Sequence, residues 1–153
     1  MLDDRTAGEI MTREVVSVAP ETTLREIAEL LIARNISGVP VVDAHGAVVG
    51  IVSETDLINE DKRRVAIPRS LLFGIFPIPE SALQEAFADG ETLTAADLMT
   101  HHPYTVHEDA SAREVCRALV ERDVNRVPVI RDGRLVGVIT RADIIRALHE
   151  HAG

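Results

Sequence analysis

The chain contains an internal repeat, and this repeat restricts its fold more than any other feature of the sequence. The matched stretches are Glu9–Val18 with Asp97–Val106, Thr23–Val42 with Ser111–Ile130, and Val48–Ile58 with Leu135–Ile145. The offset is 88 positions for the first two pairs and 87 for the third, because the turn DAHG in the first copy becomes RDG in the second. Two similar halves of one chain usually pack across a pseudo-twofold axis, which would give two related clefts.

Each copy has the local signals of a small α/β unit. Thr23-x-x-Glu26 and Ser111-x-x-Glu114 have the spacing of a capping box, so a helix is predicted to begin after Thr23 and after Ser111. VPVV and VGIV in the first copy, like VPVI and VGVI in the second, are short β-branched runs separated by a Gly-containing turn, which predicts a β-hairpin. A second helix follows each hairpin, so the order per copy is β-α-β-β-α, with small mixed sheets flanked by helices. Pro40 and Pro128 are expected at the first residue of a strand.

Composition narrows the classes of function. The 153 residues include 46% apolar and 27% charged side chains, which is typical of a globular protein. The net charge of −9 and the 3% of aromatic residues disfavour nucleic acid as a partner, because both a phosphate backbone and stacked bases would be poorly bound. A start without a basic region and an apolar core, together with the single Cys116, favours a cytoplasmic protein with no membrane association and no intrachain disulfide.

A hydroxyl followed three residues later by a carboxylate ends each hairpin, at Ser53-x-x-Asp56 and Thr140-x-x-Asp143. One interpretation is structural, since this spacing is also that of a helix capping box. The other is functional, because a helix N-terminus offers N–H donors to a phosphate while a carboxylate one turn further can accept hydrogen bonds from ribose hydroxyls. Phosphate and ribose together indicate a nucleotide.

The order of these motifs resembles a tandem pair of cystathionine β-synthase (CBS) domains, also called a Bateman module. The motifs are MT…V, then VPVV or RVPVI, then GIVSETD or GVITRAD, and they occur in both copies. The resemblance divides the chain into a first repeat at 7–58, a linker at 59–93 and a second repeat at 94–150. It implies a stand-alone regulatory module, not an enzyme, that binds AMP, ADP, ATP or S-adenosylmethionine in clefts between the two repeats.

The resemblance also implies which residues form each cleft. The first cleft would be formed by Thr12, Ser17, Ser37, Gly38 and Val39 with Thr140 and Asp143. The second would be formed by Thr100, Thr105, Asn125, Arg126 and Val127 with Ser53 and Asp56. Backbone groups near Val16, Val39, Tyr104 and Val127 would read the adenine edge. Arg126 stands where the first copy has Gly38, so the cleft with Asp56 is expected to favour more phosphate charge.

A homodimer is expected, because exposed aliphatic helix faces would remain on the repeats, and a regulated partner protein is conceivable. An alternative function keeps the fold without the ligand, as a homodimeric interaction scaffold acting through the linker. That linker holds all three Phe residues, and within it the basic trio Lys62, Arg63 and Arg64 precedes them. A short helix is predicted in it between Ser81 and Gly90.

Catalysis and metal binding are not expected. The sequence pairs no nucleophile with a base, and it has neither a P-loop nor a Rossmann glycine motif. Cys116 lies on the apolar face of a predicted helix and is interpreted as a buried thiol. The spacing of the histidines does not match a closed zinc site. These histidines are His101, His102, His107, His149 and His151.

Overall fold

A computed structural model describes residues 4–58 and 93–152. Its described part has two small three-stranded sheets flanked by helices, so the predicted α/β class is confirmed. The chain divides into two compact units. Unit 1 is Met1–Val16, Ala44–Val48 and Pro103–Gly153, and unit 2 is Ser17–Asp43 and Val49–His102.

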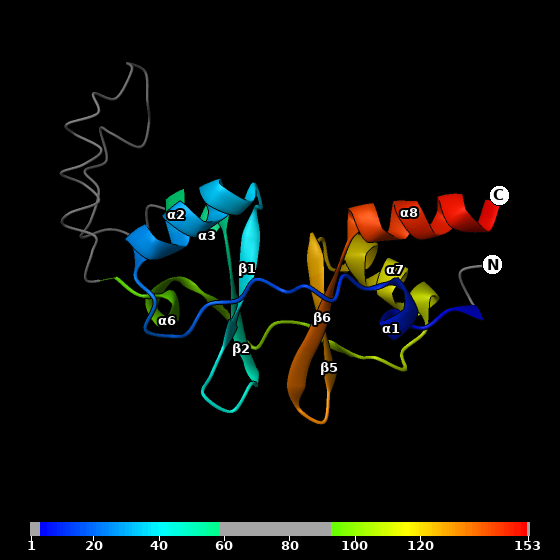
Figure 1. Ribbon diagram of the computed structural model, residues 1–153, viewed down its shortest axis with the longest axis horizontal. Helices are drawn as coiled ribbons and strands as arrows, with labels where there is room; N and C mark the ends of the chain where they lie inside the picture. Colours follow the sequence, from blue (N-terminus) through cyan, green and yellow to red (C-terminus); the bar gives the residue numbers. More distant parts are fainter. Residues whose placement is uncertain (1–3, 59–92, 153) are drawn as a thin grey trace, which may run out of the picture. The chain divides into compact units, whose positions relative to one another are not determined.

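Unit 1 contains most of the second copy of the repeat (Figure 1). Its elements are α1 (Ala7–Ile10), β4 (Val106–His107), α7 (Ala112–Glu121), β5 (Arg126–Arg131), β6 (Arg134–Thr140) and α8 (Arg141–Ala152). The sheet order is β4-β5-β6, with β4 parallel and β6 antiparallel to β5. Asp132 and Gly133 connect β5 to β6 with φ of 53° and 77°, as a two-residue type I′ turn requires, so the predicted hairpin is confirmed.

Unit 2 contains most of the first copy. Its elements are α2 (Leu24–Arg34), β1 (Gly38–Val42), β2 (Val48–Ser53), α3 (Glu54–Ile58), α6 (Ala95–Leu98) and β3 (Thr100–His101). The sheet order is β1-β2-β3. Helix α2 begins at the predicted capping box, in which Glu26 N donates to Thr23 Oγ1 at 3.2 Å and Thr23 N donates to Glu26 Oε2 at 3.0 Å. Ser111 likewise accepts from Glu114 N at 3.1 Å at the start of α7.

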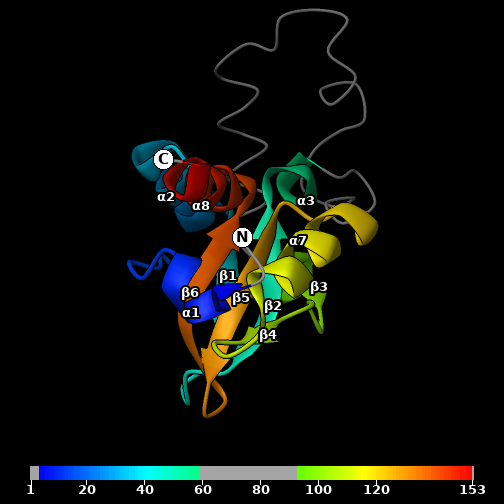
Figure 2. The same ribbon diagram turned by 90° about the vertical axis from the view of Figure 1, so that its right-hand side faces the viewer.

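The core of unit 1 is aliphatic, as the scarcity of aromatic residues requires. Apolar side chains of α1, α7 and α8 pack onto β5 and β6, and Figure 2 shows α1 beside β6. The fully buried members are Ala7, Ala112, Val115, Val127, Val129 and Ile139. Burial of such side chains is the main stabilising term for a fold of this size.

The first segment of each copy belongs to the unit that holds most of the other copy. Helix α1 joins unit 1, where Ala7 N donates to Ala110 O at 2.7 Å and Gly8 N donates to Glu108 O at 2.9 Å. Helix α6 and strand β3 join unit 2, where Ala95 N donates to Thr22 O at 2.8 Å. The compact units therefore differ from the predicted repeats 7–58 and 94–150, whose boundaries stay a prediction. The predicted linker helix, the linker Phe residues and the basic trio lie outside the described residues.

Two local expectations differ from the structure. Pro40 and Pro128 are the third residues of β1 and β5, not the first. Proline has no backbone N–H to donate. Pro40 is tolerated because the bridge to Val18 uses its carbonyl, which accepts from Val18 N at 3.0 Å. The expected first strand of the first copy is reduced to an isolated parallel bridge between Val18 and Val41.

Candidate functional site

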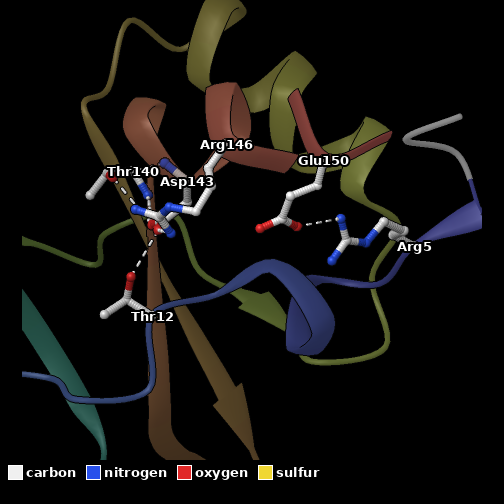
Figure 3. Close-up of polar contacts among 6 residues, drawn as sticks. All are labelled: Arg5, Thr12, Thr140, Asp143, Arg146 and Glu150. Carbon is white, nitrogen blue, oxygen red and sulfur yellow. Dashed lines mark hydrogen bonds and ion pairs between the residues drawn. The ribbon is translucent and has the colours of Figure 1, made fainter. Parts of the chain in front are cut away.

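Asp143 is held at the start of α8, directly after β6 (Figure 3). Its Oδ2 atom accepts from Thr140 N at 2.8 Å and from Thr140 Oγ1 at 3.2 Å. Asp143 N donates in return to Thr140 Oγ1 at 3.4 Å. The structural interpretation of Thr140-x-x-Asp143 as a capping box is thus correct for these local contacts.

The second oxygen of Asp143 faces two residues outside this box (Figure 3). Thr12 Oγ1 donates to Oδ1 at 2.8 Å, and Arg146 Nη1 donates to the same atom at 2.9 Å. Asp143 is only 2% exposed, so its charge is buried and depends on these donors. A helix cap needs neither Thr12 nor Arg146. The carboxylate therefore accepts two hydrogen bonds that the structural interpretation does not require.

Asp56 occupies the matching place in unit 2, at the start of α3. Its Oδ2 atom accepts from Ser53 N at 2.8 Å and from Ser53 Oγ at 3.1 Å, while Ser53 Oγ also lies 2.8 Å from Thr55 Oγ1. Asp56 is 8% exposed. Asp56 and Asp143 are the buried polar or charged residues of the described chain, and they are the pair that the repeat predicts.

The remaining predicted site residues are distributed over both units. Unit 1 holds Thr12, Val16, Tyr104, Thr105, Asn125, Arg126, Val127, Thr140 and Asp143. Unit 2 holds Ser17, Ser37, Gly38, Val39, Ser53, Asp56 and Thr100. Of the first predicted cleft, Thr12, Thr140 and Asp143 meet in unit 1, whereas Ser17 and Ser37–Val39 belong to unit 2. The predicted grouping of residues from both units into one cleft stays a prediction.

Within each unit, residues assigned to different clefts are neighbours. Arg126 and Thr140 are cross-strand partners at one end of β5 and β6. In unit 2, Ser37 O accepts from Glu54 N at 2.9 Å, which places Ser37 at the start of α3 beside Ser53. Thr100 pairs with Ile51 on β2, and Thr12 forms the matching bridge to Val138 on β6.

The residues predicted to read adenine differ in accessibility. Val39 and Val127 are fully buried in their strands, and their predicted role in reading adenine stays a prediction. Tyr104 is half-buried, and the guanidinium carbon of Arg122 lies 4.2 Å from its ring centroid. This cation–π contact covers one face of the ring.

Sequence reasoning missed Arg146 and two methionine–glycine contacts. Arg146 lies three residues after Asp143 on a predicted helix, and this spacing could have indicated an ion pair. The Met11–Gly137 and Met99–Gly50 contacts, by contrast, join segments far apart in the chain.

The described residues contain no group of three or more His, Cys, Asp or Glu side chains that could hold a metal ion. Cys116 is partly buried against the core of unit 1, and this burial raises the pKa of its thiol. A raised pKa lowers the thiolate fraction and is the opposite of what a nucleophile needs. Across the ranges 4–58 and 93–152, none of the helices has the length and apolar character of a membrane span.

The fold and the two held carboxylates define a protein of two homologous α/β repeats, each with a buried acidic residue at the start of the helix after its hairpin. The chain belongs to the CBS domain family, because the family model described as "CBS domain" matches residues 7–63 and 95–150.

Relatives of the chain are proteins with paired CBS domains. It is 34% identical over 151 residues to the CBS domain-containing protein CBSX1, chloroplastic, of Arabidopsis thaliana, covering 93% of this chain and 63% of CBSX1. The chain thus spans less than two thirds of that relative. A crystal structure of CBSX2 from Arabidopsis thaliana in complex with AMP has a TM-score of 0.75 and 28% identity, with 97% of this chain and 99% of that chain covered.

A third relative is a metal-containing protein. Hypoxic response protein 1 of Mycobacterium tuberculosis is 31% identical over 147 residues, covering 96% of this chain and 87% of the relative. A crystal structure of Hypoxic Response Protein I contains two coordinated zinc ions and has a TM-score of 0.68 at 29% identity, with 92% of this chain and 97% of that chain covered.

Proposed function

We propose that the protein is a non-catalytic regulatory module that binds an adenine nucleotide through Asp56 and Asp143. The observation that carries this proposal is the repeated, buried carboxylate at the start of the helix after each hairpin. The same buried acceptor is present at matched positions of both copies, and a carboxylate is the acceptor that a ribose diol needs.

The ligand class follows from the same places in the fold. Ser53 and Thr140 place a hydroxyl beside the N–H groups of α3 and α8, where a phosphate is favoured. AMP is the first candidate because the related CBSX2 has been crystallised with AMP. ADP, ATP and S-adenosylmethionine remain ligands to compare with it, and Arg126 would favour those with more phosphate charge near Asp56.

A thermal-shift panel of AMP, ADP, ATP and S-adenosylmethionine tests the proposal. A ligand at a hundredfold excess over its Kd adds about 2.7 kcal/mol to the free energy of unfolding. For a chain of this length this raises Tm by about 5 to 10 °C. Guanosine phosphates at the same concentration control for non-specific anion binding. A folded sample whose Tm responds to none of the adenosine compounds would contradict the proposed function.

We further propose that the module acts as a homodimer in the cytoplasm, and that a partner protein receives the signal. The support for a dimer is that large apolar side chains are exposed at matched positions of both copies. Ile32 and Val120 are 81% and 80% exposed, and Ile58 and Ile145 form the second matched pair. A self-complementary surface repeated in one chain suits an isologous contact with a second copy. The scaffold alternative needs the linker Phe residues, which lie outside the described part of the chain.

A further inference from the structure

Asp143 has no acceptor position left for a ribose. A carboxylate offers about four lone-pair positions, two on each oxygen. Thr140 N and Thr140 Oγ1 take both positions on Oδ2, and Thr12 Oγ1 and Arg146 Nη1 take both on Oδ1 (Figure 3). A ribose diol donates its hydroxyl protons to a carboxylate, so one of these donors must leave before the sugar can bind.

Three of the four donors are fixed by the fold. Thr140 N belongs to the backbone at the end of β6, and Thr140 Oγ1 is tied into the cap by Asp143 N. Thr12 is held beside Val138 by two backbone hydrogen bonds, from Thr12 N to Val138 O at 2.9 Å and from Val138 N to Thr12 O at 3.0 Å. Moving Thr140 N or the backbone of Thr12 would disturb the sheet or the start of α8, and the two hydroxyls leave the carboxylate only when another acceptor, such as a phosphate at Thr140, replaces it.

Arg146 is the donor that can leave. Its side chain is 59% exposed, whereas the side chain of Asp143 is 2% exposed, so water can replace the hydrogen bonds of the guanidinium once it moves. The long side chain can also rotate away without moving the backbone of α8. An ion pair with one exposed member is weak enough for a ligand to displace it.

The two copies differ at this position. The repeat offset of 87 places Asn59 of the first copy where the second copy has Arg146. The arginine three residues after the aspartate is therefore specific to the sequence of the second copy and is not part of the motif that the two copies share.

We propose that Arg146 competes with the ribose of the ligand for Asp143, so that the site at Asp143 binds more weakly than it would without this side chain. This inference rests on the proposed function, and it adds a residue that sets the affinity of one of the two sites.

Titration calorimetry with adenosine tests the inference, because a neutral nucleoside removes any attraction between Arg146 and a phosphate. The measurements use the full chain carrying Asp56→Asn, which leaves Asp143 as the carboxylate under study. Arg146→Ala should then strengthen adenosine binding about three- to tenfold, as expected for loss of a charged competitor. Arg146→Lys keeps a cation of similar reach and should stay within about twofold of the parent.

The matched control is Arg117→Ala, which removes another exposed arginine of unit 1 that pairs with Glu121. It should leave adenosine affinity unchanged, and thermal melts should show that every variant is folded. Unchanged or weaker binding in Arg146→Ala would overturn the inference, since Arg146 would then orient the carboxylate or have no role. A second result would also overturn it: the unmodified chain binds AMP, but Asp56→Asn binds neither adenosine nor AMP. That result would restrict the proposed function to the site at Asp56. Absence of AMP binding to the unmodified chain would overturn both.

Discussion

The side chain of Met11 lies directly over Gly137. A Cβ atom added to Gly137 would lie 2.2 Å from Met11 Sδ and 2.7 Å from Met11 Cγ. The other copy repeats this relationship, because a Cβ at Gly50 would lie 2.3 Å from Met99 Sδ. The methionine of each MT motif and the glycine of each VG motif are thus two halves of one packing contact.

Gly137→Ala should therefore reduce the free energy of unfolding by about 1 to 3 kcal/mol, as overpacking of a filled core does. Chemical denaturation measures this change. In the double variant Met11→Ala with Gly137→Ala the loss should be smaller than the sum of the two single losses, because the alanine Cβ fills part of the space left by the methionine. Additive losses would contradict a direct contact.

Asp143→Asn should affect both stability and ligand binding. The amide keeps one acceptor oxygen but places N–H groups against donors, which should cost about 1 to 3 kcal/mol of unfolding free energy. Calorimetry with AMP should show one of two sites weakened at least about tenfold, since the ribose loses a charged acceptor.

Asp97 offers a matched control for Asp143. Its Oδ2 atom accepts from Thr94 N at 2.9 Å and from Thr94 Oγ1 at 3.1 Å, the same local pattern, but Asp97 is exposed. Asp97→Asn should lower stability without changing AMP affinity. Equal effects of the two substitutions on AMP binding would indicate that Asp143 is only a cap.

Thr23→Ala should lower the free energy of unfolding by about 1 kcal/mol, because it removes the acceptor for Glu26 N at the start of α2. Thr23→Ser keeps the hydroxyl and should stay close to the parent protein. Urea denaturation compares the two variants. A loss of equal size in Thr23→Ser would show that the threonine methyl group, not the cap, is responsible.

Val120→Asp together with Ile145→Asp should convert the proposed dimer into a monomer, because a charge in an apolar contact between copies cannot be solvated. Light scattering coupled to size-exclusion chromatography measures the mass. Ala142→Asp, also on an exposed position of α8, controls for added negative charge and should leave the mass unchanged. A monomeric parent protein would remove the proposal of a homodimer.

Cys116 should react slowly with iodoacetamide at pH 8 in the folded protein, because burial raises the pKa of its thiol and lowers its thiolate fraction. In guanidinium chloride the rate should rise about tenfold or more, to that of an unstructured cysteine. Mass spectrometry can follow the modification, since the chain has a single cysteine. A fast reaction in the folded state would contradict the interpretation as an inert thiol.

The parts of the fold that the sequence predicted are those with local causes. The capping box at Thr23 and the Asp132–Gly133 turn depend on residues three or fewer positions apart, so a pattern in the sequence suffices. Helices α1 and α6 have four residues each and were not predicted, because their positions depend on hydrogen bonds to distant segments. The strand expected before α2 is only a bridge at Val18 for the same reason.

The candidate site also contains local contacts, which the sequence predicted, and contacts between distant segments, which spacing alone did not predict. The bonds between Asp143 and Thr140 follow from a local motif, and the repeat identified Asp56 as the counterpart of Asp143. The bond from Thr12 spans 131 positions, and its partner in the second copy was assigned from the resemblance, not from spacing. Arg146 stands where the first copy has Asn59, so comparison of the copies gave no reason to select it.

Helix α1 lies in unit 1 and helix α6 in unit 2, so each compact unit takes its opening helix from the other copy of the repeat. One copy expressed alone would lack that helix and could obtain it only by exchange with a second molecule. In this chain the exchange takes place within one polypeptide, so the folding of each unit depends on both copies.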